Sequence, residues 1–289
     1  MISLRVGGVP EHFNLPWHLL LESGGARALG LDAAWRDVPE GSGAMAAALE
    51  DGALDIAMLL TEGAVAGIAN RGAFSIVSWY TVSPLVWGIH VPAQSRFEEV
   101  ADIVGARYAV SRRGSGSHLM AVVHAEQRGW PADTLDLVVV GNLEGAIEAF
   151  ASGRADVFFW EKFMTKPLVD SGRFRRIGEF VAPWPAFVVC VAERALVDRG
   201  AAIRSLLSAV FATAATLSRN PEGPRLIASR YGLERADVEQ WLELTQWADE
   251  IAVTGDGLAP VVAALRNLKL IPAAFDVRRA MARLPLEAR

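Results

Sequence analysis

The loop SRRGSGSH, from Ser111 to His118, has the residue types of an anion-binding site. It follows an apolar run typical of a strand and precedes a run typical of an amphipathic helix. The start of a helix carries unpaired N–H groups and a partial positive charge, which favour a carboxylate, sulfonate or phosphate. A simple helix cap by Ser117 is the alternative. We predict that the ligand contacts of this loop come from Ser111, Gly114, Ser115, Gly116, Ser117 and His118.

The stretch PEHFNLPWH holds the corresponding position in the first part of the chain. Asn14, Trp17 and His18 lie where a strand-like run gives way to a helix-like run, so we predict that all three contact the ligand. Trp17 offers a flat surface for an aromatic or heterocyclic ligand, or else it seals the top of a hydrophobic core.

Two more loops precede helix-like runs. PEGSGAM contains Ser42 and Gly43, which can present N–H groups to a ligand, and VGNLEG offers Asn142 for the same purpose. Both loops also fit ordinary strand-to-helix turns. We include all three residues among the predicted ligand contacts.

An acidic residue ends an apolar strand-like run at two matching positions. LLTEG places Thr61 and Glu62 after one run, and FFWEKF places Trp160 and Glu161 after the other. These carboxylates can accept N–H groups from a ligand or act as an acid or base. The alternative is a salt bridge at a helix start or a hinge.

Tryptophan is frequent, with nine residues against three tyrosines. Trp87 and Trp184 lie in the two strand-like runs that connect the halves of the chain. They form an aromatic wall for a planar ligand, or they pack the connection between the halves.

Other chemistries have little support. Cys190 is the single cysteine, and its strand-like surroundings FVVCVA predict a packed core thiol rather than a nucleophile. His12 and His18 are six positions apart, as are His118 and His124, so neither pair has the i, i+4 spacing of a metal-binding helix. We therefore predict no metal site, and we assign no catalytic residue and no cofactor.

An internal repeat predicts the elements that position these residues. The stretches beginning LRVGGV and ARYAVS each continue as strand, helix, strand, helix and strand, and each ends in Gly-x-apolar-Asp. Arg5 and Asp55 are 50 positions apart, and Arg107 and Asp156 are 49 apart. This order predicts two β-α-β-α-β units with parallel strands and right-handed crossovers.

Two apolar runs connect these units. One covers residues 74–91 and is broken at Ser83-Pro84, and the other contains a Pro-Trp-Pro break. Helix-like runs follow from about Glu193. We therefore predict a discontinuous lobe 1 of residues 1–89 and 184–289, and a lobe 2 of residues 90–183.

The bulk composition excludes several classes of protein. The chain has 289 residues, of which 52% are apolar and 21% are charged, as in a packed globular protein. A net charge of −5 without a basic cluster argues against nucleic-acid binding. No apolar run reaches the roughly 18 residues that a membrane span needs, so we predict none.

The phrases GGVPEHFNLPWHLLLESG, SRRGSGSHLMA and FFWEKFMTKPLVDSGRFRRIGE resemble the type 2 periplasmic-binding-protein superfamily. The resemblance covers nearly the whole chain. It is strongest to the branch of alkanesulfonate/nitrate/taurine-type binding proteins and Thi5-like pyrimidine-precursor synthases. It implies an α/β, two-lobed fold with C-terminal helices, and a ligand held in a cleft between the lobes.

The resemblance implies a binder of a small molecule, an organic anion or a planar heterocycle, with hinge closure of the lobes. The alternative is a cytosolic enzyme on the same fold, of the Thi5-like or menaquinone-pathway kind. The cysteine-rich motif of the Thi5-like enzymes does not occur here, which favours the binder.

The expected partners are the ligand and an ABC permease, and the expected state is a monomer or dimer. We expect a cytoplasmic location because no secretion signal is evident in this sequence. A periplasmic or cell-surface location is the alternative if a leader was removed.

Overall fold

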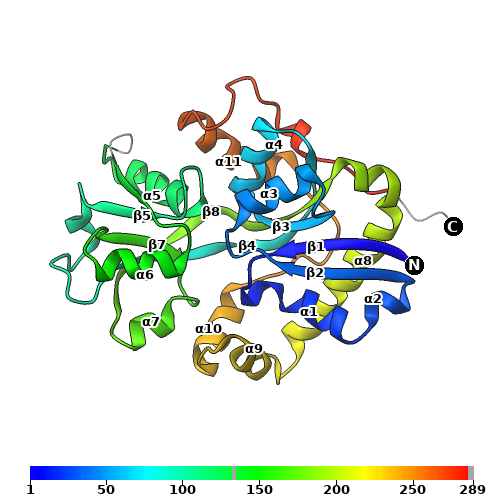
Figure 1. The fold of residues 1–289 in the computed structure, drawn as a ribbon, viewed down its shortest axis with the longest axis horizontal. Coiled ribbons are helices and arrows are strands. Elements are labelled where there is room, and N and C mark those ends of the chain that lie inside the picture. Colours follow the sequence, from blue (N-terminus) through cyan, green and yellow to red (C-terminus); the bar gives the residue numbers. More distant parts are fainter. Residues whose placement is uncertain (132–134, 286–289) are drawn as a thin grey trace. The chain divides into compact units, whose positions relative to one another are not determined.

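The computed structural model describes residues 1–131 and 135–285, and it divides into two compact units. Unit 1 consists of Met1–Ser83 and Pro183–Arg289, and unit 2 consists of Pro84–Ala182. Figure 1 shows their elements in chain order. The predicted lobe boundaries at 89/90 and 183/184 stay a prediction.

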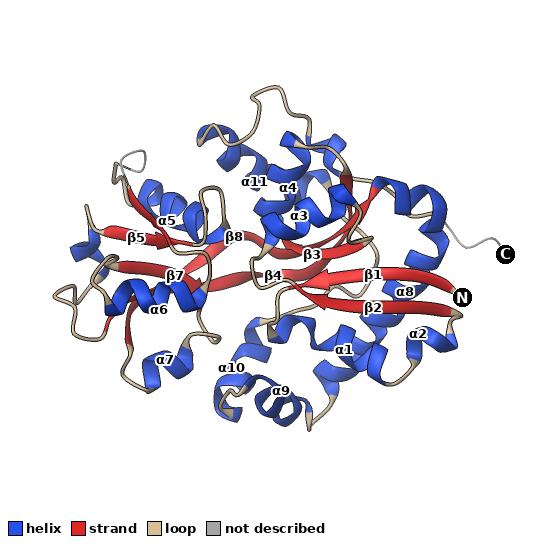
Figure 2. Ribbon diagram, in the orientation of Figure 1, coloured by secondary structure: helices blue, strands red, loops and turns tan. Residues whose placement is uncertain are grey.

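Unit 1 begins with three parallel strands, β1 (Ile2–Gly8), β2 (Leu31–Asp37) and β3 (Ile56–Leu60), in the order β2-β1-β3. Because the crossovers are right-handed, helices that lead to opposite sides of β1 cover opposite faces of the sheet. Figure 2 shows this arrangement. On one face are α1 (Leu15–Glu22) and α2 (Gly25–Ala28), and on the other are α3 (Ser42–Asp51) and α4 (Thr61–Asn70).

Unit 2 repeats this pattern in a shorter form. Its parallel strands are β5 (Arg107–Val110), β6 (Asp136–Val139) and β7 (Val157–Glu161), in the order β7-β5-β6. Its helices are α5 (Gly116–Gln127), α6 (Leu143–Ala151) and α7 (Lys166–Asp170). The predicted β-α-β-α-β repeat is therefore confirmed in both halves of the chain.

The repeat extends to individual atoms. Asp55 accepts hydrogen bonds from the backbone N–H, Nε and Nη2 of Arg5, at 2.9, 3.0 and 2.8 Å. Asp156 accepts from the same three atoms of Arg107, at 2.9, 2.8 and 2.8 Å. Each unit therefore contains the same pairing between its first parallel strand and the residue that precedes its third.

Two strands of 19 residues, β4 (Phe74–Pro92) and β8 (Phe174–Ala192), pass through both units. In unit 1, β8 pairs antiparallel with β3, and in unit 2, β4 pairs antiparallel with β7. The predicted interruptions at Ser83-Pro84 and Pro183-Trp184-Pro185 do not end either strand. Proline lacks only the N–H donor and accepts an extended backbone, so it remains in a strand wherever that donor is not needed.

The C-terminal part of unit 1 is helical, as expected. It contains α8 (Glu193–Arg219), α9 (Gly223–Tyr231), α10 (Arg235–Leu244) and α11 (Gly255–Asn267). Among the described helices, α8 has the length and mean hydropathy that would allow a membrane span. Its buried residues recur every three or four positions, as in Ile203, Leu207 and Val210, which is the spacing of a helix with one face on a protein core.

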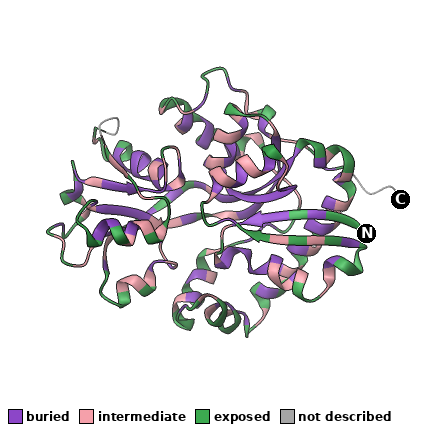
Figure 3. Cartoon of the chain, viewed as in Figure 1, coloured by how far each residue is buried: buried purple, intermediate pink, exposed green. Residues whose placement is uncertain are grey.

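Burial is deepest in the strands (Figure 3). Residues 56–59 of β3 are all buried, as expected for a parallel strand with helices on both faces. Cys190 lies in this core, and burial raises the pKa of its thiol well above the ordinary value. The prediction of a packed core thiol is confirmed.

Candidate functional site

In unit 1, three helices begin at one edge of the sheet. Gly8 at the end of β1 is paired with Asp37 at the end of β2, and the parallel β3 ends at Leu60. The carboxyl ends of parallel strands lie together, so the loops that lead to α1, α3 and α4 share this edge. Open α/β sheets bind their ligands at such an edge.

The N-terminal end of α1 buries polar atoms without satisfying all of them. Asn14 is 1% exposed and donates from Nδ2 to the carbonyl of Val9 at 2.8 Å. Within the described residues its Oδ1 has no hydrogen-bond partner, and neither has Nε1 of Trp17. Trp17 is fully buried beside Trp35, with ring centroids 6.0 Å apart. The indole therefore lies in the core of unit 1, and its contact with a ligand stays a prediction.

His18 lies in the first turn of α1 and is half-buried, and its ring centroid lies 5.0 Å from that of Trp35. Burial lowers the pKa of His18, and the charge of Arg230 lowers it further. A lowered pKa favours the neutral imidazole, in which one ring nitrogen donates a hydrogen bond and the other accepts one.

The starts of α3 and α4 are joined. The hydroxyl oxygen of Ser42 accepts from the backbone N–H of Leu60 at 3.0 Å. A Cβ on Gly63 would lie 2.6 Å from Cβ of Ser42, so the two helices approach closely there. Thr61 is fully buried and donates to the carbonyl of Pro185 at 2.6 Å. Gly43 occupies the first turn of α3. These contacts hold the first turn of α4 in a fixed position.

Glu62 lies in this first turn and is 2% exposed. Its Oε2 accepts from Nε1 of Trp184 at 2.9 Å, while its Oε1 has no partner in the described part of the chain. Burial raises the pKa of Glu62 to about 7, and hydrogen bonds from its own backbone and from Trp184 oppose that shift. The result is a carboxyl group that gains or loses a proton near neutral pH.

In unit 2, the Ser111–His118 loop forms a hydrogen-bonded cluster. Ser115 caps α5 by accepting from the backbone N–H of His118 at 3.4 Å. Ser117 accepts from the backbone N–H of Ser111 at 3.0 Å, and its hydroxyl lies 3.0 Å from that of Ser115. All three serines are buried. The alternative that Ser117 caps the helix does not hold, because Ser115 has that position.

The rest of the loop is organised around His118. The backbone N–H of Gly114 donates to Nδ1 of His118 at 2.8 Å. Gly114 has a φ of 80°, a conformation that favours glycine at this turn. Burial lowers the pKa of His118, and the charge of Arg113 lowers it further. Gly116 is the first residue of α5, so its backbone N–H belongs to the unpaired set at a helix start.

The other predicted residues of unit 2 occupy different environments. Asn142 is exposed and caps α6 by accepting from the backbone N–H of Gly145 at 3.0 Å. Oε2 of Glu161 accepts from the backbone N–H groups of Phe163 and Met164, at 2.8 and 2.6 Å. Glu161 thus stabilises the turn after β7.

Two tryptophans complete the predicted set in unit 2. Trp160 stacks on Phe158 with ring centroids 4.9 Å apart. Trp87 is 4% exposed and is paired in register with Glu161. Among the described residues, its Nε1 has no hydrogen-bond partner. Trp87 therefore combines a buried ring with an unused donor.

A buried histidine of unit 1 was not among the predicted ligand contacts. His12 is fully buried, with its ring centroid 4.1 Å from that of Trp241 and 4.8 Å from that of Phe13. Neither ring nitrogen has a partner within the described residues, and burial lowers the pKa of His12 to about 3. In the sequence, the one indication was that His12 lies two residues before Asn14. Its aromatic neighbour Trp241 comes from a distant helix and could not be inferred.

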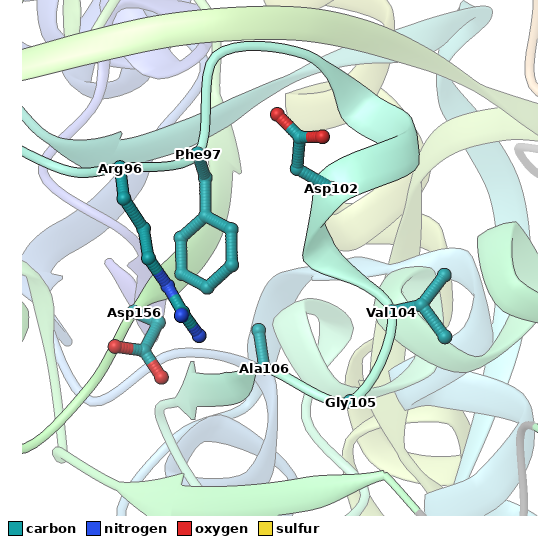
Figure 4. Close-up of a pocket in the computed structure, with 7 residues that line it drawn as sticks. All are labelled: Arg96, Phe97, Asp102, Val104, Gly105, Ala106 and Asp156. Carbon is teal, nitrogen blue, oxygen red and sulfur yellow. The ribbon is translucent and has the colours of Figure 1, made fainter.

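A pocket of about 350 Å³ lies in unit 2 at the amino ends of β5 and β7, away from the carboxyl ends where the predicted contacts lie. Figure 4 shows the Arg96 side chain directed toward Asp156, with Phe97 and Asp102 also lining the pocket. The guanidinium of Arg96 lies 4.9 Å from the ring centroid of Phe97. This pocket is lined by none of the predicted site residues, all of which belong to the described part of the chain.

The buried carboxyl group of Glu62 predicts a specific pH dependence of stability. The folded protein keeps the proton up to about pH 7, whereas the unfolded chain releases it near 4.5, so ionisation destabilises the fold as the pH rises through this window. The quantity to compare is the free energy of unfolding of wild type minus that of Glu62→Gln. We expect this difference to fall by about 3 kcal/mol between a pH below 4.5 and a pH above 7.

Urea unfolding of both proteins across this pH range measures the difference, and the subtraction removes the contributions of the other titrating groups. A difference that does not change with pH would contradict the raised pKa.

Comparisons with known proteins agree with the fold. The family model described as Ca3427-like PBP matches residues 87–180. The structure of the Candida albicans CA3427 gene product is similar, with 24% identity, a TM-score of 0.91, and coverage of 100% of this chain and 99% of that chain. A search of curated proteins found no match.

Two sulfonate-binding proteins have similar structures. The alkanesulfonate-binding protein SsuA from Xanthomonas axonopodis pv. citri, bound to MOPS, has 20% identity and a TM-score of 0.83, covering 98% of this chain and 99% of that one. The periplasmic aliphatic sulphonate binding protein SsuA from Escherichia coli has 19% identity and a TM-score of 0.76, covering 100% and 94%. The chain therefore has the periplasmic-binding-protein fold, and its residues 87–180 match the Ca3427-like family of that fold.

Proposed function

We propose that this protein binds a small organic molecule at the carboxyl ends of its parallel strands. One observation carries the proposal: the chain matches, over 98% of its own length and 99% of the other, the structure of a binding protein with a small molecule bound. The unused polar atoms at the edge of unit 1 support it, since buried polar groups in proteins are normally paired.

The predicted ligand contacts divide between the units. Unit 1 contributes Asn14, Ser42 and Glu62 near the starts of its helices. Unit 2 contributes the start of α5, where a helix N-terminus favours a negatively charged group. Closure of the two lobes on the ligand and delivery to an ABC permease are finer parts of this proposal. The cytoplasmic location of the protein also stays a prediction.

An enzyme is the second candidate, and Glu62 is the observation that favours it. A general acid or base works best when its pKa lies near the working pH, and the pKa of Glu62 is about 7. Buried carboxyl groups of this kind are frequent in active sites, but structural positions also produce them.

Native mass spectrometry of the purified protein tests the proposal. We expect a bound compound that denaturation releases, and we expect protein stripped of that compound to recover the same mass increase when it is added back. Recovery of the compound unchanged after incubation supports a binder, and its conversion supports an enzyme. Protein that neither carries a compound nor binds any member of a metabolite panel would contradict both.

A further inference from the structure

Glu62 is an incompletely paired carboxyl group held in a rigid setting. Three hydrogen bonds fix its surroundings: Leu60 to Ser42, Thr61 to Pro185, and Trp184 to Oε2 of Glu62 itself. The side chain is 2% exposed, yet within the described residues its Oε1 accepts nothing. The side chain is therefore positioned, but one of its two oxygens is left over.

A structural role explains one oxygen of this carboxyl group, Oε2, but not the other, Oε1. The bond from Trp184 explains Oε2, and the start of α4 favours a negative charge. Among the ion pairs of the described residues, none involves Glu62. A buried carboxylate whose only donors among the described residues are neutral, Trp184 and its own backbone, is costly, and an amide side chain would satisfy Trp184 without that cost. The remaining acceptor therefore points to a donor that arrives with the ligand.

We propose that Oε1 of Glu62 accepts a hydrogen bond from a nitrogen base, so that the ligand carries an amidine, a guanidine or an amino-substituted heterocycle. This inference rests on the proposed binding function and names its ligand class. A charged N–H group satisfies Oε1 and neutralises the buried carboxylate in one contact. Oε1 of Glu62 and Oδ1 of Asn14 both lack a hydrogen-bond partner in the described part of unit 1, and both are acceptors that require a donor.

The same group discriminates against other ligands. The sulfonate-binding proteins of this fold accept an anion. A sulfonate placed against Glu62 would meet a like charge, or would require the carboxyl group to stay protonated. Repulsion of this kind is a common source of specificity. Of two ligands with the same ring, the one that carries a nitrogen base should therefore bind more tightly to Glu62 than the one that carries a sulfonate.

The test uses benzamidine and benzenesulfonate, which share a ring and differ in charge, with isothermal titration calorimetry on the full chain. We expect benzamidine to bind wild type more tightly than benzenesulfonate does. Glu62→Gln should weaken benzamidine binding ten- to a hundredfold, as loss of a charge-assisted hydrogen bond does. Glu50→Gln is the matched control, because it removes the same charge from an exposed residue of unit 1 that pairs with Arg71.

A measurement on wild type alone keeps the inference testable if Glu62→Gln does not fold. Near pH 7, binding of benzamidine should release protons from Glu62, and titrations in buffers of different ionisation enthalpy count them. The groups that act on this carboxyl are its own backbone and Trp184. Burial also raises the pKa of Glu11 to about 7, so the same titration on Glu11→Gln must still show the proton release.

Benzamidine that binds without proton release, that binds Glu62→Gln equally well, or that does not bind at millimolar concentration would overturn the inference. Benzenesulfonate that binds Glu62→Gln no more tightly than wild type would do the same, because removal of the carboxylate should relieve its repulsion of the sulfonate. None of these outcomes touches the proposed function, which fails only if no small molecule is carried or bound.

Discussion

Replacing Asp55 with alanine is expected to lower the free energy of unfolding of unit 1 by about 3 kcal/mol. Asp55 is fully buried, and it accepts from three atoms of Arg5 and from Nη2 of Arg199 at 2.8 Å. Burial alone would raise the pKa of Asp55, but these hydrogen bonds hold it below its ordinary value. The side chain of Arg5 is 47% exposed, so its charge remains solvated and the loss falls at the low end of the range for buried pairs.

Asp156→Ala is the internal control for this prediction. Asp156 makes the same three hydrogen bonds with Arg107, but its side chain is 23% exposed and no second arginine bonds to it in the described structure. We therefore expect a smaller loss, in unit 2. Urea unfolding followed by hydrogen exchange assigns each loss to its unit. Equal losses for the two variants would show that burial of Asp55 does not set the energy.

From the sequence, the pairing of arginine and aspartate in each unit was visible only as an equal separation along the chain. A repeat of strands and helices was visible because apolar periodicity and turn residues are local signals. The matching separations of Arg5 from Asp55 and Arg107 from Asp156 supported it. The second arginine that bonds to Asp55, Arg199, could not be predicted, because it comes from a distant helix that contacts β1 only in the folded chain.

The candidate site was predictable in position but not in hydrogen bonding. Residues at the carboxyl ends of strands can be found from the repeat, and the structure places Glu62 and the Ser115 loop there. The partner of Glu62 could not be found, because Trp184 lies 122 positions away. The environment of His12 was missed for the same reason, since Trp241 reaches it from α10.

Replacing Trp17 with alanine is expected to destabilise unit 1 by about 3–5 kcal/mol. The indole is fully buried against Trp35, so truncation leaves a large apolar cavity that the surrounding strands and helices can fill only in part. Urea unfolding measures the loss. A change below about 1 kcal/mol would show that the indole does not belong to the core.

Trp17→Phe separates the two roles that the sequence left open. It keeps most of the ring and removes an N–H that has no partner within the described residues, so we expect a cost below about 2 kcal/mol. If Trp17 only fills the core, binding of the ligand recovered from the protein is unchanged. If Trp17 donates to the ligand, affinity falls while stability is nearly preserved.

Unit 2 is one unbroken stretch, Pro84–Ala182, whereas unit 1 is assembled from both ends of the chain. A ribosome therefore delivers all of unit 2 before it has made the second portion of unit 1. Until then β3 lacks its antiparallel neighbour β8, and Asp55 lacks Arg199. Since domains fold as units during synthesis, the middle of the chain should mature first. Until β8 is made, the edge of β3 remains unpaired. Unpaired strand edges are surfaces on which nascent chains aggregate and to which chaperones bind.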